Sequence, residues 1–342
     1  MAMKIDASRL KKYLLPAGLA ILFLINLFLI LEFFGIEVID RYLKGILILM
    51  QINIILAVSL NLINGVTGML SLGHAGFMAV GAYVSAILSI VLSKSNLPEA
   101  LLFPLVLCAG GLVAAFIGLL IGVPTLRLRG DYLAIATLGF GEIIRVVILN
   151  LDITKGARGL PGIPNYTNLW WVEVFMVLSV LVIWNMTKSN HGRALASIRE
   201  NEIAAEAMGV HTTYYKVSAF VIGAFFAGLA GGLFAHYLGY ISPKSFDFMK
   251  SIEILLMVVL GGLGSLTGSV IAAIVLTGLP ELLRFLQSYR MVIYSLTLVL
   301  LMLYRQEGLF GRDEASAELL RKWLTPRKKN HPGGEAGEPT ES

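Results

Sequence analysis

Long apolar runs dominate this sequence and restrict it to folds that lipid can surround. A helix rises about 1.5 Å per residue, so roughly 20 apolar residues cross a hydrocarbon core about 30 Å thick. With 57% hydrophobic and only 14% charged residues, the 342-residue chain has too little charge to cover a soluble domain. Runs of this length predict membrane-spanning helices near residues 13–34, 43–63, 72–92, 101–123, 131–150, 170–187, 215–239, 267–286 and 290–304.

A further apolar run, 252–262, is about half as long and ends in a cluster of glycines. Basic residues gather in four places: at the N-terminus, between the fourth and fifth runs, between the sixth and seventh, and after the last. All four lie on one side only if the short run also crosses, with its glycine loop on that side. That side is the cytoplasm, because basic loops are retained there. We therefore predict an all-α, polytopic transmembrane helical bundle of about ten spans with interrupted helices and with both termini cytoplasmic.

The loops 151–169 and 240–251 then face outward, although they contain Lys155, Arg158, Lys244 and Lys250. Residues 1–309 form the predicted transmembrane domain. Residues 310–342 form a basic and disordered cytoplasmic tail, within which 312–329 is either an interfacial helix or a plain basic anchor. The first run is too long for a signal peptide and lacks a cleavage site, so we expect a retained span.

Composition also excludes some classes of function. The net charge of +5 is explained by basic loops beside the bilayer, so we expect no nucleic-acid partner. Cys108 is the only cysteine, which excludes an internal disulfide and a cysteine-based metal site. The five histidines have no ligand spacing, and no P-loop, His-Glu-x-x-His or Gly-x-Ser-x-Gly motif occurs. We therefore expect no enzyme activity and no bound metal, and any ATP hydrolysis must belong to another subunit.

Two glycine-rich interruptions resemble each other, at 65–71 and at 261–267. Interrupted helices at matching places predict a substrate path, since unwound backbone is tolerated only where it is buried or lines a cavity. Chance similarity is the alternative for so short a match, and His74 is alternatively a buried histidine bonded to a backbone carbonyl. The candidate residues for the path and its gating are Gly65, Gly68, Ser71, Gly73, His74, Gly261, Gly264 and Thr267.

Glu142 and Arg145 form a second candidate, because residues three apart share one helix face. Charges within a span are costly unless they are paired or face a cavity. The two residues are therefore either a structural ion pair or part of a gate.

The polar segment 192–209 forms a third candidate, predicted to be one helix on the cytoplasmic surface. Ala204, Ala205 and Met208 give it one small apolar face, and Gly209 is placed to end it. Such a helix is suited to docking in a groove of a partner. An ordinary connecting loop is the alternative.

Taken together, these segments resemble a known family. The runs GMLSLGHAGFMAVGAY, RLRGDYLAIATLGFGEIIR, GLPGIP, GRALASIRENEIAAEAMGV and SPKSFDFMKSIEILLMVVLGGLGSLTG are similar to bacterial branched-chain amino acid ABC transporter permeases of the M type. The likeness extends from about Asn61 to Leu309. Urea and short-amide permeases are similar in nearly the same segments.

The resemblance implies a permease subunit in a bacterial inner membrane that imports leucine, isoleucine or valine. The implied partners are an H-type permease subunit, two cytoplasmic ATPase subunits that bind ATP and Mg²⁺, and a periplasmic substrate-binding protein. This chain itself would bind no cofactor. A urea or short-amide permease is the nearest alternative. An ion-coupled secondary transporter is less favoured, since Glu142 is the only clear mid-span carboxylate while Glu253 and Glu281 lie nearer the edges.

The segment 192–209 is also similar to the coupling helix of ABC importers, whose signature is Glu-Ala-Ala-x-x-x-Gly. Ala204, Ala205 and Gly209 match, but Ile203 stands where the signature has Glu, and Glu202 lies one residue earlier. The resemblance implies ATPase coupling through Gly192, Arg193, Arg199, Glu200, Asn201, Glu202, Ala204, Ala205 and Gly209.

Overall fold

The computed structural model describes residues 40–93, 98–126, 128, 130–284, 289 and 295–296. The predicted first span, the C-terminal tail and nearly all of the predicted last span lie outside the described residues. Within them, six helices are long and apolar enough to cross a membrane, and each ends within about three residues of a predicted run. They are α2 (Arg41–Asn61, continued by the π-helix η1, Leu62–Val66), α3 (His74–Leu92), α4 (Glu99–Thr125), α5 (Asp131–Asn150), α6 (Leu169–Lys188) and α9 (Thr212–Leu238).

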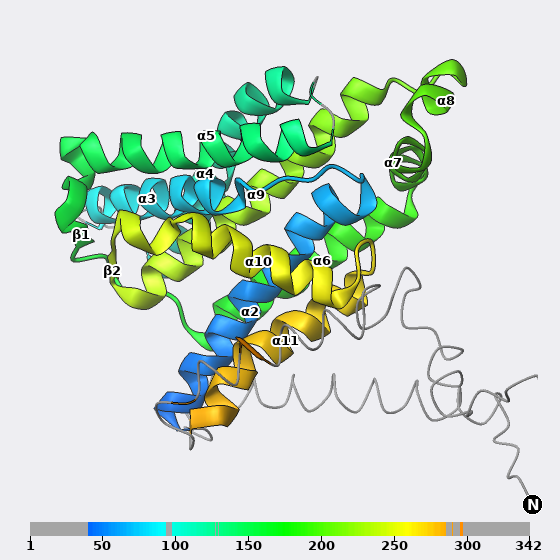
Figure 1. The fold of residues 1–342 in the computed structure, drawn as a ribbon. Coiled ribbons are helices and arrows are strands. Elements are labelled where there is room, and N and C mark those ends of the chain that lie inside the picture. Colours follow the sequence, from blue (N-terminus) through cyan, green and yellow to red (C-terminus); the bar gives the residue numbers. More distant parts are fainter. Residues whose placement is uncertain are drawn as a thin grey trace, which may run out of the picture.

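Two shorter apolar helices form a hairpin beside α2 (Figure 1). They are α10 (Phe248–Gly261, 14 residues) and α11 (Leu266–Leu282, 17 residues). The first is the predicted half-length run and the second is shorter than the predicted 267–286. The described residues thus contain six candidate spans in a helical membrane bundle, and the count of about ten stays a prediction.

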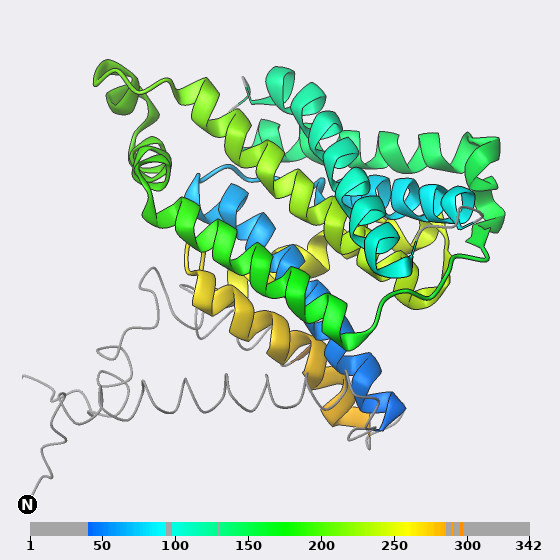
Figure 2. The ribbon, with the colours of Figure 1, turned by 180° about the vertical axis from the view of Figure 1, so that it is seen from behind.

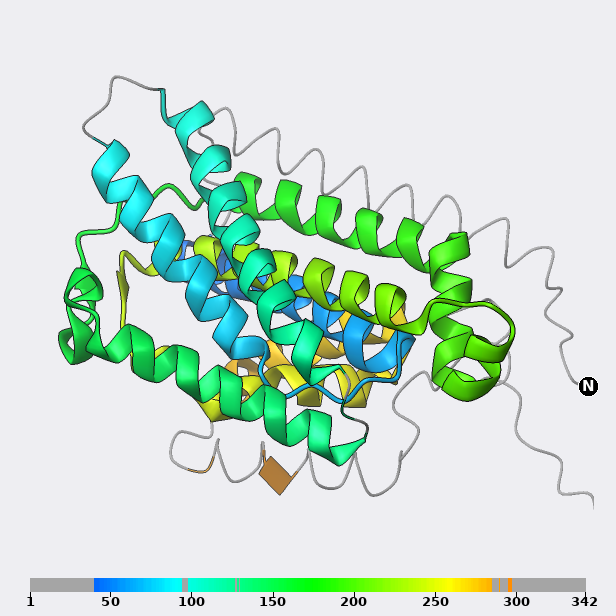
Figure 3. The same ribbon diagram turned by 90° about the horizontal axis from the view of Figure 1, so that it is seen from above.

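The helices α3, α4 and α9 pack closely against one another, and α2 is the most buried of the six candidate spans in the described residues. Glycines allow this packing: a Cβ atom added at Gly81 would overlap the backbone of Gly228, and one at Gly231 would overlap Met78. Small residues let helices approach closely where lipid offers no hydrophobic driving force between them. Seen from behind, α6 and α11 flank α2 (Figure 2). Seen from above, α5 lies at the rim of the described bundle, across from α6 (Figure 3).

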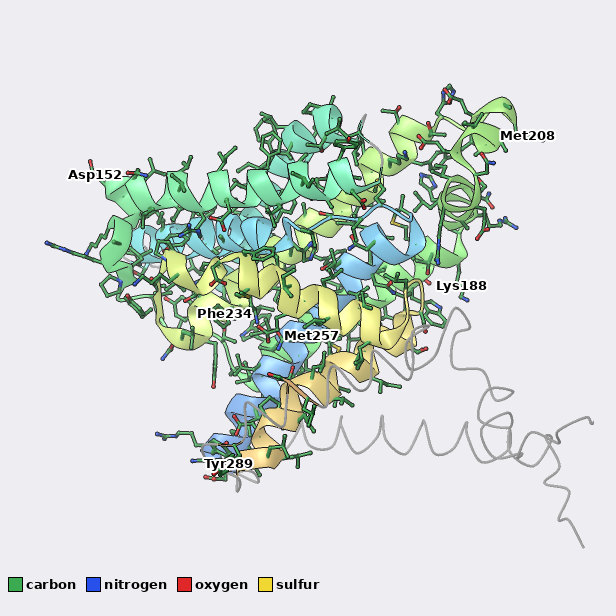
Figure 4. The ribbon with its side chains drawn as sticks, in the orientation of Figure 1. Asp152, Lys188, Met208, Phe234, Met257 and Tyr289 are labelled. Carbon is green, nitrogen blue, oxygen red and sulfur yellow. The ribbon has the colours of Figure 1, made fainter. Side chains whose placement is uncertain are left out.

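The bundle has two distinct ends. At one end, which we call the sheet end, β1 (Leu160–Pro161) pairs antiparallel with β2 (Tyr240–Ile241). The short helices η2 (Asp152–Thr154), η3 (Gly156–Arg158) and η4 (Pro243–Phe246) lie in the same two loops. The opposite end, which we call the surface-helix end, has α7 (Asn190–Glu200) and α8 (Glu202–Ala207). Asp152 and Met208 mark these two ends in Figure 4.

This arrangement agrees with the grouping of loops predicted from charge. The connections 151–168 and 239–247 lie at the sheet end, whereas η1, the 262–265 turn and the segment around Leu128 lie with α7 and α8. Which end faces the cytoplasm stays a prediction.

The prediction of one continuous helix over 192–209 is wrong. The backbone is extended at Asn201 (φ −158°, ψ 107°), and its Oδ1 accepts the Ala204 N–H at 3.0 Å, so Asn201 caps a new helix. Gly209, at φ 85°, ends α8 as predicted, and the Val210 N–H reaches back to the Ala205 carbonyl at 3.0 Å.

Candidate coupling and translocation site

The two glycine-rich interruptions meet at the surface-helix end. The fully buried Asn61 joins them: its Oδ1 accepts the Gly264 N–H at 2.9 Å, and its Nδ2 donates to the Ser265 carbonyl at 3.0 Å. A Cβ atom at Gly65 would overlap the Gly264 backbone, so the segments touch directly. Within the second turn, Gly261 lies against Gly268, and the Thr267 hydroxyl lies 3.4 Å from Ser265 Oγ. Two segments related only by sequence pattern are therefore one structural unit.

Arg199, at the end of α7, contacts both interruptions. Its Nη1 donates to the Gly65 carbonyl, and its Nη2 lies 3.5 Å from the Leu263 carbonyl. Its side chain also fills the space above Gly68. A residue predicted to act in coupling thus lies against residues predicted to line the path.

The start of α3 holds the other candidates of this segment in a buried polar network. Asn64 accepts the Ser71 N–H at 3.1 Å and donates to the Ser71 carbonyl at 3.2 Å. His74 is buried, with Nε2 2.9 Å from Ser59 Oγ. Ser71 Oγ and His74 Nδ1 have no hydrogen-bond partner in the described part of the chain. Gly73 lies against the Thr137 carbonyl, where a Cβ atom would overlap it.

Glu142 and Arg145 form an ion pair on α5, with 2.8 Å between Arg145 Nε and Glu142 Oε2. Their side chains are 36% and 28% exposed, and α5 is the least buried of the six candidate spans in the described residues. Glu142 also lines a narrow crevice with Gly76 and Ser251. A half-exposed charge pair within a span is costly against lipid. This face of α5 is therefore suited to a polar path or to another protein chain.

The exposed surface of α7 and α8 differs from the predicted apolar face. Ala205 is only 5% exposed and faces the bundle, so its assignment to the docking face is wrong. Ile203 and Met208 are 68% and 84% exposed, and Ala204 lies exposed between them. Met208 projects at the tip of α8 (Figure 4). The exposed apolar patch of α8 is thus Ile203, Ala204 and Met208.

The remaining coupling candidates anchor this patch to the bundle. Gly192 is buried against the Thr187 carbonyl, whereas Arg193 and Glu200 lie exposed on α7. Glu202 pairs with the buried Lys216 of α9 at 2.6 Å, which ties α8 to a long helix. A cavity of about 400 Å³ lies between α7–α8, the turn after η1 and the start of α5, with Arg199 and Lys216 in its lining.

The sequence patterns did not predict the contacts of two polar side chains, Glu173 and Lys250. Glu173, in the second turn of α6, is buried and accepts a hydrogen bond from Gln51 of α2, a contact that the sequence patterns did not predict. Glu173 lies within the predicted run 170–187, but no sequence pattern pointed to its partner 122 residues away.

Lys250, predicted in an outward loop, lies instead in the first turn of α10. Its Nζ is 3.1 Å from Glu253 Oε2 and 3.5 Å from Asn53 Oδ1, and the Asn53 amide donates to Thr277 at 2.9 Å. Within the described residues, no three His, Cys, Asp or Glu side chains are grouped to hold a metal ion.

Six long apolar helices within the described residues indicate a multi-pass membrane protein. The model of a family described as "Branched-chain amino acid transport system / permease component" matches residues 42–304, and the chain belongs to this family. The resemblance drawn from the sequence motifs is therefore confirmed.

Characterised relatives cover most of the chain. It is 38% identical to the high-affinity branched-chain amino acid transport system permease protein LivM of Escherichia coli K12, over 90% of this chain and 80% of that protein. It is also 38% identical to LivM of Salmonella typhimurium, over 79% of this chain and 70% of that protein. The permease protein LivH of Escherichia coli K12 is 26% identical, over 76% of this chain and 91% of that protein. No solved structure matches the chain significantly.

Proposed function

We propose that this chain is the permease subunit of an ATP-driven importer that carries leucine, isoleucine and valine across a bacterial inner membrane. The observation that carries this proposal is the 38% identity to a branched-chain amino acid permease over 90% of the chain. The absence of a P-loop from the sequence supports a separate ATPase.

The assembly contains, besides this chain, an H-type permease subunit, two cytoplasmic ATPase subunits that hold ATP and Mg²⁺, and a periplasmic binding protein. The similarity to LivH, itself named a permease protein, supports two related permease subunits. The Glu142–Arg145 pair is partly exposed on α5, which supports placing either the second subunit or the substrate path against this helix. With ten spans and both termini in the cytoplasm, the surface-helix end faces the ATPases.

The mechanism begins at α7 and α8. When the two ATPase subunits bind ATP and close together, they move these docked helices. The movement passes to the two glycine-rich interruptions, at residues 65–68 and 261–264, which we call the helix breaks. Alternating access follows when the broken helices rock around the path. Few polar side chains are needed along it, because a branched side chain is apolar and selectivity resides in the binding protein.

Uptake by the reconstituted complex tests the function. Proteoliposomes that contain both permeases and both ATPases, with the binding protein added, should accumulate labelled leucine and valine only when ATP is supplied. Uptake of urea in place of leucine and valine would replace the substrate assignment with the short-amide alternative. Uptake that follows an ion gradient without ATP would overturn the proposal.

A substitution in the α8 patch tests the docking surface. Met208→Asp places a charge in an apolar contact, so we expect at least a tenfold loss of ATPase subunits co-purified with the permease. The matched control is Met249→Asp, because Met249 is 68% exposed in the first turn of α10, near the sheet end. Equal co-purification of the two variants would contradict docking through α8.

A further inference from the structure

We propose that Arg199 is a positioning residue that fastens both helix breaks to α7, so that one movement of α7 displaces both. The inference rests on the proposed coupling role of α7 and α8. It adds the route by which their movement reaches the membrane-spanning helices.

The first step is the hydrogen bonding. The last carbonyls of a helix lack partners within that helix, and η1 ends at Val66 while α10 ends at Gly261. Arg199 donates to the Gly65 carbonyl, one residue before η1 ends, and its Nη2 lies 3.5 Å from the carbonyl of Leu263, which is in the turn two residues beyond α10. A guanidinium presents several donors in a planar fork, so one side chain can serve two carbonyls. Its charge also suits the carbonyl-rich ends of two helices.

The second step is the room that the glycines provide. A Cβ atom at Gly68 would be 2.9 Å from Arg199 Cγ, and one at Gly264 would be 2.5 Å from Arg199 Nη1. Both glycines also have positive φ, 75° and 93°. The two similar segments therefore open toward the same side chain. This shared neighbour gives the glycines of the two interruptions a common purpose that does not require contact with substrate.

The third step is the place of α7 between the bundle and α8. Leu195 and Ile198 of α7 are buried, so this helix packs directly against the bundle beside the two breaks. Two residues after Arg199, the backbone is extended at Asn201, where α7 has ended and α8 begins. Helix α8 carries the exposed patch. Arg199 thus stands between the docking patch and the two breaks.

The test measures ATP hydrolysed per substrate molecule imported by the full reconstituted complex, for Arg199→Met and Arg199→Lys. Arg199→Met should retain bound, hydrolysing ATPase subunits but raise this ratio at least tenfold. Lysine lacks the planar fork and reaches one carbonyl, so Arg199→Lys should give an intermediate ratio. The control Arg158→Met makes the same side-chain change at an exposed position of the sheet end and should leave the ratio unchanged.

A second pair of variants approaches the same contact from the glycine side. Gly264→Ala displaces the guanidinium and should raise the ratio as Arg199→Met does. Gly162→Ala is its matched control, because Gly162 has φ 78° but no atom of the described residues lies within 4 Å of an added Cβ atom, so this change adds only backbone strain.

The outcomes separate this inference from the proposed function. An unchanged ratio in a folded Arg199→Met complex overturns it, even if thermal stability falls, because a merely structural residue would lower stability alone. If Arg199→Met does not fold, the ratio of ATP hydrolysed to substrate imported in Gly264→Ala, compared with Gly162→Ala, decides. If Gly264→Ala also fails to fold, the same ratio in Arg199→Lys, compared with wild type, decides. Loss of docking in Met208→Asp together with an unchanged ratio in the Arg199 variants would overturn this inference and leave the proposed function standing.

Discussion

Single polar side chains connect the helix breaks of this apolar bundle. Asn61 uses both atoms of its amide on backbone groups of the 264–265 turn, and Arg199 approaches the same region from α7. Removing one partner leaves a buried backbone group unsatisfied, and that loss costs more than the bond itself contributed.

Asn61→Ala should therefore lower the free energy of unfolding by about 2 kcal/mol, roughly 1 kcal/mol for each lost bond. The measurement is thermal unfolding of the purified protein in detergent. The control is Asn150→Ala, because the Asn150 amide is exposed and donates to the Val146 carbonyl of its own helix. Identical melting temperatures for the two variants would show that Asn61 does not join the breaks.

Glu142 and Arg145 permit a charge-reversal test. Glu142→Arg and Arg145→Glu each place like charges at i and i+3 and should each destabilise the protein by roughly 1 kcal/mol. The double variant restores the pair and should recover most of the loss, measured by folded yield in detergent. Without recovery, each side chain must have a separate role, as expected for a gate.

Local pairs were predictable from sequence and distant pairs were not. The Glu142–Arg145 bond follows from a spacing of three on one helix. Arg199 and Gly65 are 134 residues apart, and Gln51 and Glu173 are 122 apart. Only the fold brings such residues together, so the sequence showed the polar groups without their partners.

At the scale of helices, the apolar runs predicted six spans closely because span length is fixed by the bilayer. The break at Asn201 was missed, since the surrounding residues favour a helix on both sides. Its signal was Asn201 itself, a favoured N-cap residue directly before Glu202 and Ile203. The same break explains why Ala205 is buried and Ile203 is exposed. The extended backbone at Asn201 changes the orientation of α8 relative to α7.

Glycine contacts between helices give a prediction at this scale. Gly81→Val should prevent stable packing of α3 on α9, with a loss of at least roughly 3 kcal/mol, because the added side chain meets the Gly228 backbone. The matched control is Gly139→Val on α5, where an added Cβ atom meets none of the described residues within 4 Å and the expected change is within about 0.5 kcal/mol. Folded yield of the single subunit in detergent separates the two. Equal yields would show that α3 and α9 do not pack through glycine.

At the scale of the whole molecule, the two ends predict an orientation that single-cysteine labelling can measure. Cys108 is the only cysteine, so Cys108→Ala gives a cysteine-free background. In that background, Arg158→Cys should react with a membrane-impermeant maleimide from the outer face, and Glu206→Cys only from the cytoplasmic face. Both residues are exposed. Labelling of both from the same face would contradict the proposed orientation.

The contact between the two breaks also has a consequence for the order of synthesis. Gly264 follows Asn61 by 203 residues, which a ribosome adds in roughly 10–40 s at about 5–20 residues per second. Throughout that interval the first break is already made while its partner turn does not yet exist. The nascent chain therefore carries an open, polar interruption, first until Arg199 emerges and then until the α10–α11 hairpin arrives. A chain stopped before residue 264 keeps this interruption exposed, so truncation late in the sequence should leave an early helix as the target of membrane quality control.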